Sequence, residues 1–368
     1  MENTIFLYTK YKNLKNTGVN MSKNPLIKIK IIGVGGGGGN TVHRMAKNIP
    51  EGTSLLALNT DLQALENIKD IQTFAIGPNT TNGMGTGGNP EIGKKSMKES
   101  YNQIEELVIG SDMVFITAGM GGGTGTGGSS IVAEICKKHG ILTIGIVTLP
   151  FTFEGDDRRQ TALNGLKKLN QKLDALITID NNTLLPALKE STSLINAFEK
   201  VDTILEQGVK GISEVINLPG LINVDFADLK TIMINGGQSL MSVGFGDGKD
   251  AAIQAIESAL SNPLINKTID QANGILFYIK GGNDISLGQI HEVANKIKTI
   301  TQYNPKVMFG VVREKNMKNK VNITLIATGI EKPNYKIDTK IIDLKNNSLN
   351  YNINNELNNL SQKIPINI

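Results

Sequence analysis

The sequence lacks the features that define several large classes of protein. Its 368 residues contain one cysteine, Cys136, which excludes a disulfide framework within the chain and is typical of a reducing compartment. The three histidines are scattered, and no Cys/His cluster has the spacing of a zinc site. No apolar run approaches the roughly 18 residues of a membrane-spanning helix. We therefore expect no structural metal site and no direct membrane insertion.

The chain also lacks a strong excess of either charge. A formal net charge of +4 gives no reason to expect a nucleic-acid partner. Hydrophobic residues make up 39% and charged residues 20% of the chain, as in an ordinary globular protein. Because 368 residues exceed what one hydrophobic core usually accommodates, two domains are expected.

Glycine, by contrast, is abundant, and its densest stretch is residues 119–128, Gly-Met-Gly-Gly-Gly-Thr-Gly-Thr-Gly-Gly. Because each glycine costs conformational entropy on folding, we predict a loop here, not a strand or a helix interior. The apolar run 112–118 before it predicts a strand, and the apolar spacing in 129–138 predicts a helix after it. Such a loop can bind phosphate through its backbone amides, whereas the alternative is a flexible turn.

A second glycine stretch, residues 33–41, follows an apolar segment predicted to be a strand. Gly33, Gly35 and Gly38 satisfy the dinucleotide-binding pattern G-x-G-x-x-G, and Asp61 offers the acid that such a fold needs after its second strand. A dinucleotide-dependent oxidoreductase is therefore a rival hypothesis. The further glycine stretches and the lack of an evident hydride-transfer constellation argue against it.

A third glycine stretch covers residues 82–90. Three such stretches between alternating strands and helices predict a doubly wound α/β domain in which several strand ends converge on one polyphosphate. Residues 88–95 nearly fit the P-loop pattern. Lys95, however, stands where a magnesium-binding Ser or Thr is required, and no strand leads into the segment, so a P-loop is rejected.

Residues 121–127, Gly-Gly-Gly-Thr-Gly-Thr-Gly, resemble the signature loop of the tubulin/FtsZ family, and residues 223–233 are a second specific match. The resemblance covers roughly residues 27–330 and is closest to the bacterial FtsZ branch. It implies a polymerising GTPase that binds GTP or GDP with Mg²⁺ in the cytoplasm at the mid-cell division site. It also implies head-to-tail assembly with copies of itself and division-machinery partners bound through the C-terminal tail.

The resemblance further implies a set of nucleotide-binding residues. Those implied for the phosphates lie in two glycine stretches: Gly36, Gly37, Gly38, Gly39, Asn40, Gly122, Gly123, Thr124 and Gly125. Four more implied residues lie at strand ends or in the turns after them. They are Asn59, Asn181, Glu154, which would contact the ribose, and Arg158, which would lie near the phosphates and base. Phe198 would stack on guanine, and Asp202 would accept hydrogen bonds from the N1–H and exocyclic amine of the base. A carboxylate there favours guanine over adenine, which presents an acceptor at N1.

The residues alone leave other interpretations open. Glu154 and Arg158 are four apart and could form an ordinary helical ion pair. By its helical spacing Phe198 could be a core residue, and Asp202 could face solvent. Asp225 is a good helix N-cap, with Asp228 as an acceptable capping-box partner.

The spacing of apolar residues in 194–217 predicts one long amphipathic helix. The eighteen residues from Phe198 to Ile216 span about 27 Å at 1.5 Å per residue. Asp225 and Asp228 therefore cannot reach a nucleotide held at the start of that helix. If they act in hydrolysis with the help of Asn223, they act on a nucleotide bound to another subunit. Such a head-to-tail contact propagates when it does not close into a ring.

The later part of the chain is expected to form a smaller α+β domain. Strands are predicted at 239–245, 274–280, 306–312 and 321–328, with helices at 251–260 and 286–300. The predicted domain order is a GTP-binding domain at 27–193, the central helix and start of the catalytic loop at 194–223, and the α+β domain at 224–330.

The two ends, 1–26 and the asparagine-rich 331–368, are expected to be disordered. In the tail, Ile364-Pro365 resembles part of the family's partner-binding peptide, but no aromatic or arginine follows it, so binding of partners there is expected to be altered. This departure also motivates a second hypothesis, a nucleotide-binding filament scaffold with little hydrolysis.

Overall fold

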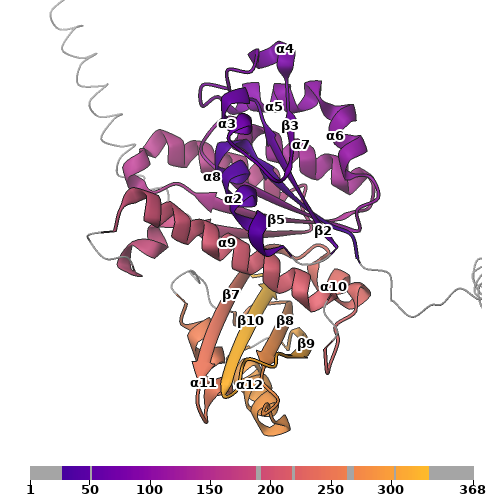
Figure 1. The fold of residues 1–368 in the computed structure, drawn as a ribbon, viewed down its shortest axis with the longest axis vertical. Coiled ribbons are helices and arrows are strands. Elements are labelled where there is room, and N and C mark those ends of the chain that lie inside the picture. Colours follow the sequence, from indigo (N-terminus) through magenta and orange to yellow (C-terminus); the bar gives the residue numbers. More distant parts are fainter. Residues whose placement is uncertain are drawn as a thin grey trace, which may run out of the picture. The chain divides into compact units, whose positions relative to one another are not determined.

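The structure is a computed structural model that describes residues 27–49, 52–187, 192–217, 220–262, 269–301 and 304–330 (Figure 1). The ends predicted to be disordered, 1–26 and 331–368, lie outside the described residues. One ten-stranded sheet, in the order β3-β2-β1-β4-β5-β6-β7-β10-β8-β9, runs through the described part of the chain. The residues before and after the long helix α9 (Leu194–Asn217) contribute different halves of this sheet.

The first half of the sheet is parallel throughout. Its strands are β1 (Ile29–Val34), β2 (Thr53–Asn59), β3 (Gln72–Ala75), β4 (Met113–Gly119), β5 (Leu142–Leu149) and β6 (Ala175–Asp180). The order 3-2-1-4-5-6 is that of a doubly wound fold and confirms the predicted class. The chain order reverses between β1 and β4, so a crevice is expected at the carboxyl ends of these two strands.

Helices cover both faces of this half. They are α2 (Gly35–Met45), α3 (Leu62–Glu66), α4 (Pro78–Thr81), α5 (Pro90–Glu99), α6 (Tyr101–Val108), α7 (Thr124–Lys138) and α8 (Asp156–Asn170), with 3₁₀ turns η1 (Ala46–Asn48), η2 (Thr152–Glu154) and η3 (Asn181–Ala187). Ile29 and Ile31 of β1 share a core with Val42 of α2 and Val201 of α9. Successive residues of a strand point to opposite faces of the sheet. Helices α5, α6 and α8 pack on α7.

Two of the glycine stretches turn into helices earlier than predicted. Helix α2 begins at Gly35, inside the first stretch, and α7 begins at Thr124, inside the signature loop. The prediction of loops through both stretches was therefore wrong beyond these positions. Close packing explains the glycines: a Cβ on Gly127 would lie 1.9 Å from the carbonyl oxygen of Pro90 on α5. Glycine costs conformational entropy on folding, but it is the residue that allows two backbones to pack in direct contact.

Helix α9 has the predicted bounds, and its 24 residues span about 36 Å. Val201, Leu205, Val209 and Ile212 bury its apolar face, as the spacing predicted. Figure 1 shows α9 crossing between the two halves of the sheet, with α10 (Phe226–Met233) beside its C-terminal end.

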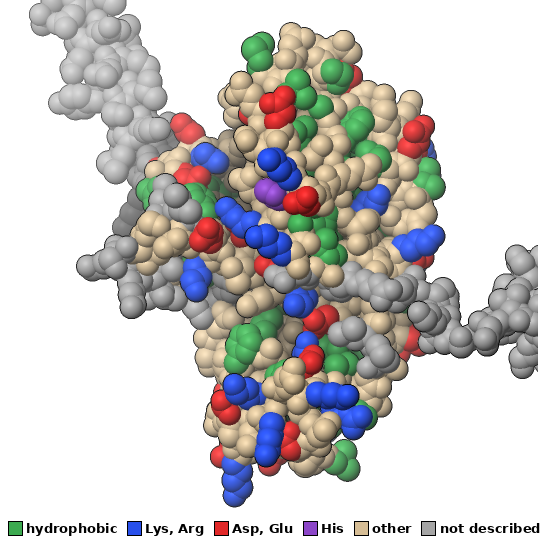
Figure 2. Space-filling model, viewed as in Figure 1, with side chains coloured by type: hydrophobic (Ala, Val, Ile, Leu, Met, Phe, Trp, Pro, Cys, Tyr) green, Lys and Arg blue, Asp and Glu red, His purple; other side chains and the backbone are tan. Residues whose placement is uncertain are grey.

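The second half of the sheet and its helices match the predicted strands and helices, and every boundary lies within two residues of its prediction. They are β7 (Gly237–Asp247), α11 (Ala251–Leu260), β8 (Gly274–Gly281), α12 (Leu287–Ile300), β9 (Lys306–Arg313) and β10 (Lys320–Thr328). Strand β10 is antiparallel to β7 and β8, and β7 joins the parallel half through three residue pairs with β6. A second core lies between these strands and α11 and α12. On the face shown in Figure 2, basic and acidic side chains are interspersed.

Candidate functional site

A cavity of about 470 Å³ opens at the carboxyl edge of the parallel strands, where β1 and β4 separate. Its wall comes from the end of β1 and the first turn of α2, from residues 118–125, from the ends of β5 and β6, and from the N-terminal half of α9. The crevice expected at the topological switch point is therefore present.

One side of the wall is a cradle of backbone. Gly36 and Gly37 contribute from the first turn of α2, and Gly122 and Gly123 from the turn before α7. A Cβ on Gly36 or Gly122 would meet no atom within 4 Å, so these backbones face open space. Two helix N-termini at one cavity favour an anion. The cradle fits the phosphate chain of a nucleotide.

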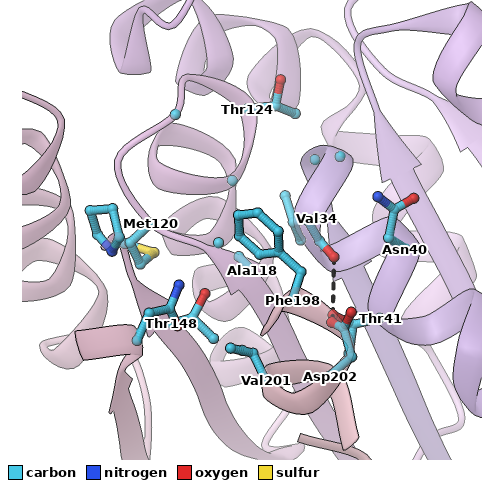
Figure 3. Close-up of a pocket in the computed structure, with 18 of the residues that line it drawn as sticks. Val34, Asn40, Thr41, Ala118, Met120, Thr124, Thr148, Phe198, Val201 and Asp202 are labelled. Carbon is cyan, nitrogen blue, oxygen red and sulfur yellow. Dashed lines mark hydrogen bonds between the residues drawn. The ribbon is translucent and has the colours of Figure 1, made fainter. Parts of the chain in front are cut away.

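Figure 3 shows Phe198 and Asp202 of α9 at the opposite side of the cavity. Phe198 is 36% exposed and meets Phe151 edge to face, with ring centroids 5.6 Å apart, so it is not a core residue. Asp202 is only 8% exposed, accepts a hydrogen bond from the Thr41 hydroxyl and forms an ion pair with Arg44. The solvent-facing interpretation of Asp202 is therefore wrong.

Asn181, directly after β6, supplies a polar group that the fold leaves unsatisfied. The residue is 4% exposed, and its Oδ1 has no hydrogen-bond partner within the described part of the chain. Buried acceptors in proteins are rarely left without a donor. Since Asn181 lines the cavity, its oxygen is available to a donor on a bound ligand.

Glu154 and Arg158 do form an ion pair, with 3.2 Å between Oε2 and Nε. They do not share one helix, however, because Gly155, at φ 99°, separates η2 from α8. The other carboxylate oxygen of Glu154 accepts a hydrogen bond from the Phe151 amide at 2.9 Å. Both paired side chains line the cavity.

Three of the predicted nucleotide-binding residues do not line the cavity. Asn59 is buried, and its Oδ1 accepts the backbone amides of Thr60 and Asp61. A Cβ on Gly38 would lie 2.3 Å from a backbone oxygen of β4, and one on Gly39 would lie 3.1 Å from Ile68. These glycines allow close packing of α2 against its neighbours and do not belong to the wall.

The remaining predicted residues, Asn40, Thr124 and Gly125, do line the cavity. Further wall residues were not predicted: Thr41, Arg44, Thr86, Met120, Thr148 and Pro150. Thr86 belongs to the third glycine stretch, whose convergence on the site was predicted without naming a residue. Arg44 follows Asn40 by one helical turn, and this spacing was the available signal.

The residues around Asp225 do not line this cavity. Asp225 caps α10, and its Oδ1 accepts the Asp228 amide at 2.6 Å, as the N-cap interpretation predicted, but the Asp228 side chain does not return the second bond of a capping box. The side-chain oxygen of Asn223 accepts the Gly220 amide at 2.5 Å. The Asp228 carboxylate is exposed and makes no hydrogen bond or ion pair within the described residues. This group follows the C-terminal end of α9, beside which α10 lies (Figure 1), whereas the cavity takes its wall residues from the N-terminal half of α9.

The described ranges contain neither a cluster of metal-binding side chains nor a membrane-spanning helix. No group of three His, Cys, Asp or Glu residues there could hold a metal ion. None of the helices described is long and apolar enough to cross a bilayer.

Sheet order and glycine cradle together define a nucleotide-binding α/β protein. Residues 28–189 match the model of the tubulin/FtsZ family GTPase domain, and residues 237–331 match that of the FtsZ family C-terminal domain. The chain belongs to the tubulin/FtsZ family. The dinucleotide alternative, which depended on the first glycine stretch alone, is therefore wrong.

Individual relatives match over most of their length. The chain is 45% identical to cell division protein FtsZ of Pseudomonas aeruginosa over 318 residues, which cover 85% of this chain and 81% of that protein. The cell division protein FtsZ of Azotobacter vinelandii is 44% identical to this chain, again over 85% of this chain and 81% of that protein. Among solved structures, an empty FtsZ dimer of M. jannaschii matches with a TM-score of 0.78 and 40% identity, covering 87% of this chain and 92% of that one.

Proposed function

We propose that this chain is a GTP-dependent polymerising GTPase of the bacterial division ring. It acts in the cytoplasm at the mid-cell division site, and the Asp225/Asp228 loop of the adjacent subunit completes its hydrolytic site. The observation that carries this proposal is the separation of the two groups along α9. A helix of about 36 Å keeps the acids of one molecule away from its own cavity.

The cradle is proposed to hold the phosphates of GTP or GDP through backbone amides, with Asn40 and Thr124 beside them. Both carboxylates of the wall, on Glu154 and Asp202, are already paired with arginines. Mg²⁺ in nucleotide sites is held largely by phosphate oxygens and water, and this donor set suits that arrangement. When bound, the ion would neutralise charge on the phosphates.

The other side of the cavity is proposed to recognise the base. Phe198 offers an exposed ring for stacking, held in place by Phe151. Asp202 is oriented by its bonds to Thr41 and Arg44, and its oxygens are proposed to accept the two donors on the guanine edge. Glu154, with Arg158 beside it, is proposed to contact the ribose, and the open acceptor of Asn181 adds a further contact.

Hydrolysis is proposed to occur where two molecules meet head to tail. Asp225 and Asp228 of one molecule, helped by Asn223, would orient and polarise the water that attacks the γ-phosphate on the next. Phosphoryl transfer mainly needs positioning and charge stabilisation, so a loop supplied by a neighbour is sufficient. Loss of the γ-phosphate would weaken the contact and allow turnover.

Exposed apolar side chains near both ends of α9 support such a contact. Met84, 81% exposed, and Phe153, 63% exposed, flank segments that form the cavity wall. Leu221, 59% exposed, lies next to the acid loop. Burial of such exposed apolar side chains against a neighbour would favour association. Division-machinery partners are proposed to bind the tail 331–368, outside the described residues.

Mixing two inactive variants tests the shared site. D228A removes a proposed catalytic carboxylate but keeps the backbone amide that Asp225 caps. G122E has room for its side chain and puts a negative charge into the cradle. Each variant alone should release little phosphate from GTP. Because G122E can still offer its Asp228 to GTP bound by D228A, the mixture should recover activity.

The same experiment has a direct contrary outcome. If the acids acted within one molecule, the mixture would remain as inactive as its components. Turnover of the wild type should also rise more steeply than linearly with protein concentration, because the site forms only on association. G122A, which adds no charge, serves as the control for the cradle.

A further inference from the structure

A second cavity, of about 170 Å³, lies behind the phosphate cradle, between α5, α7 and α8. Its wall includes Glu91 and Lys94 of α5, Thr126 of α7, and Thr161, Asn164 and Lys168 of α8. None of these side chains lines the nucleotide cavity. The function proposed above gives this second cavity no role.

Positive charge exceeds negative charge around this cavity. Lys168 pairs with Glu91 at 3.2 Å, but both side chains are more than 60% exposed, so solvent screens the pair strongly. Lys94 is half-buried and has no carboxylate within ion-pair distance among the described residues. The Lys168 and Lys94 cations together hold the pKa of the Glu91 carboxyl below its usual range. The wall therefore holds one carboxylate and two ammonium groups, and Glu134 of α7, outside the wall, also interacts with the charge of Lys94.

Neutral hydrogen-bond donors complete the wall. The Thr161 hydroxyl forms no hydrogen bond within the part of the chain described. The side-chain oxygen of Asn164 accepts from Gln160 at 3.3 Å, which leaves the two N–H groups of its carboxamide free to donate. A cavity with free N–H, O–H and ammonium donors matches a ligand that only accepts hydrogen bonds and carries negative charge.

Packing of backbone against backbone fixes the shape of this cavity. A Cβ on Gly127 would lie 1.9 Å from the Pro90 oxygen, and one on Gly165 would lie 2.2 Å from a Thr126 methyl carbon. The three helices therefore cannot move apart or together without losing these contacts. Binding cavities that are formed before the ligand arrives avoid the cost of ordering them.

We propose that this cavity binds a phosphate-class oxyanion, free or carried by a small metabolite, at a site separate from the nucleotide. Lys94 is its principal cation, with Lys168, Thr161 and Asn164 as further donors. The bound anion would touch Thr126, whose hydroxyl accepts the Gly121 amide at 2.8 Å. The proposed anion site is therefore close to Gly121, the residue directly before Gly122 and Gly123 of the cradle.

Calorimetric titration of the full chain tests the proposal. The protein is first loaded with a nonhydrolysable GTP analogue to fill the cradle, and loading is measured by absorbance after free nucleotide is removed. Inorganic phosphate and glycerol phosphate are then titrated separately, and the tighter of the two identifies the source of the group. K94M keeps the apolar stem of the lysine but loses its charge. K95M, at the exposed neighbour outside the cavity wall, is the matched control.

We expect saturable binding of at least one probe by the wild type and K95M, and about tenfold weaker binding by K94M. Absence of binding by the wild type, or equal binding by K94M and K95M, would overturn the proposal. Failure to load the analogue would count against the proposed function and not against the anion site. The anion site is tested by the difference between K94M and K95M, which is measured whether or not the analogue loads.

Discussion

The carboxylate of Asp225 accepts a hydrogen bond from the backbone amide of Asp228 at 2.6 Å. This bond caps α10 and holds together the two acids that we propose to act on a neighbour's nucleotide. Asp225 would thus have a structural and a catalytic task, whereas the Asp228 side chain is free of any structural one. The two tasks can be separated by the choice of substitution.

Serine at position 225 keeps a side-chain acceptor for the cap but loses the carboxylate. We expect D225S and D228A to retain the free energy of unfolding of the wild type, while D225A loses about 1 kcal/mol with its cap. All three should lower GTP turnover by about 100-fold or more, as removal of a group that acts on the attacking water does. Urea unfolding and phosphate release give the two quantities. Wild-type turnover in D225S would show that only the cap matters.

Phe198 and Phe153 both pack on Phe151, and only Phe198 lines the nucleotide cavity. If Phe198 stacks on the base, F198A should lose about 1–3 kcal/mol of binding free energy. This corresponds to about 5- to 150-fold weaker GTP binding. F153A is the matched control and should bind GTP as the wild type does. Fluorescent GTP is titrated below the concentration of assembly, and equal losses in both variants would contradict the stacking role.

Gly93 of α5 and Gly288 of α12 are both helical glycines, but they have very different surroundings. A Cβ on Gly93 would lie 2.4 Å from the Gly123 oxygen in the cradle, whereas one on Gly288 has no atom nearer than 3.7 Å. We expect G93A to lose about 1–3 kcal/mol of stability through overpacking and to bind GTP more weakly.

The same change at Gly288 should raise stability by up to about 1 kcal/mol, because alanine is the better helix former. Thermal unfolding and GTP titration of both variants provide the comparison. A neutral G93A would mean that α5 can shift away from the cradle at little cost, which would contradict the rigid packing described above.

Segments with long and regular apolar spacing could be predicted from the sequence. Helix α9, strand β6 and helix α11 have the predicted bounds because burial of one face decides their structure. The short elements α3, α4 and β3 were not predicted, since four or five residues carry too little periodicity. The glycines at the start of α2 and α7 were assigned to loops. These glycines are helical because of contacts with backbone that is distant in sequence, and the intrinsic helix propensity of glycine contains no information on such contacts.

Residues of the cavity wall could be predicted where one local pattern supplies several of them, as in the two glycine stretches. The partners of Asp202 could not be predicted in this way. Thr41 lies 161 residues away in sequence, and only the packing of α9 beside α2 brings its hydroxyl to the carboxylate. Asn59 illustrates the limit of such patterns, because it lies at a strand end but its side-chain oxygen accepts a neighbouring backbone amide and the residue is not part of the cavity wall.

Glu99, at the end of α5, holds the short helix α4 that precedes the third glycine stretch. Its two carboxylate oxygens accept the amide and carboxamide of Asn79, both at 2.8 Å, and the amide and hydroxyl of Thr80, at 3.0 and 2.6 Å. The Thr80 hydroxyl, followed by the Asn79 amide, holds the pKa of the Glu99 carboxyl below its ordinary value of 4.5. Above pH 4.5 the carboxylate therefore stabilises the folded state, and this contribution is lost as the pH falls through the lowered pKa.

We expect E99Q to unfold at a lower temperature than the wild type at pH 7, with the difference shrinking as the pH falls below 4.5 and through the lowered pKa of Glu99. The control is E106Q on α6, where the exposed carboxylate makes no hydrogen bond or ion pair within the described residues. Its difference from the wild type should stay small over the same range. Melting temperatures of the three proteins at half-unit steps of pH give the comparison. A gap for E99Q that does not shrink as the pH falls below 4.5 would show that its effect is one of packing and not of charge.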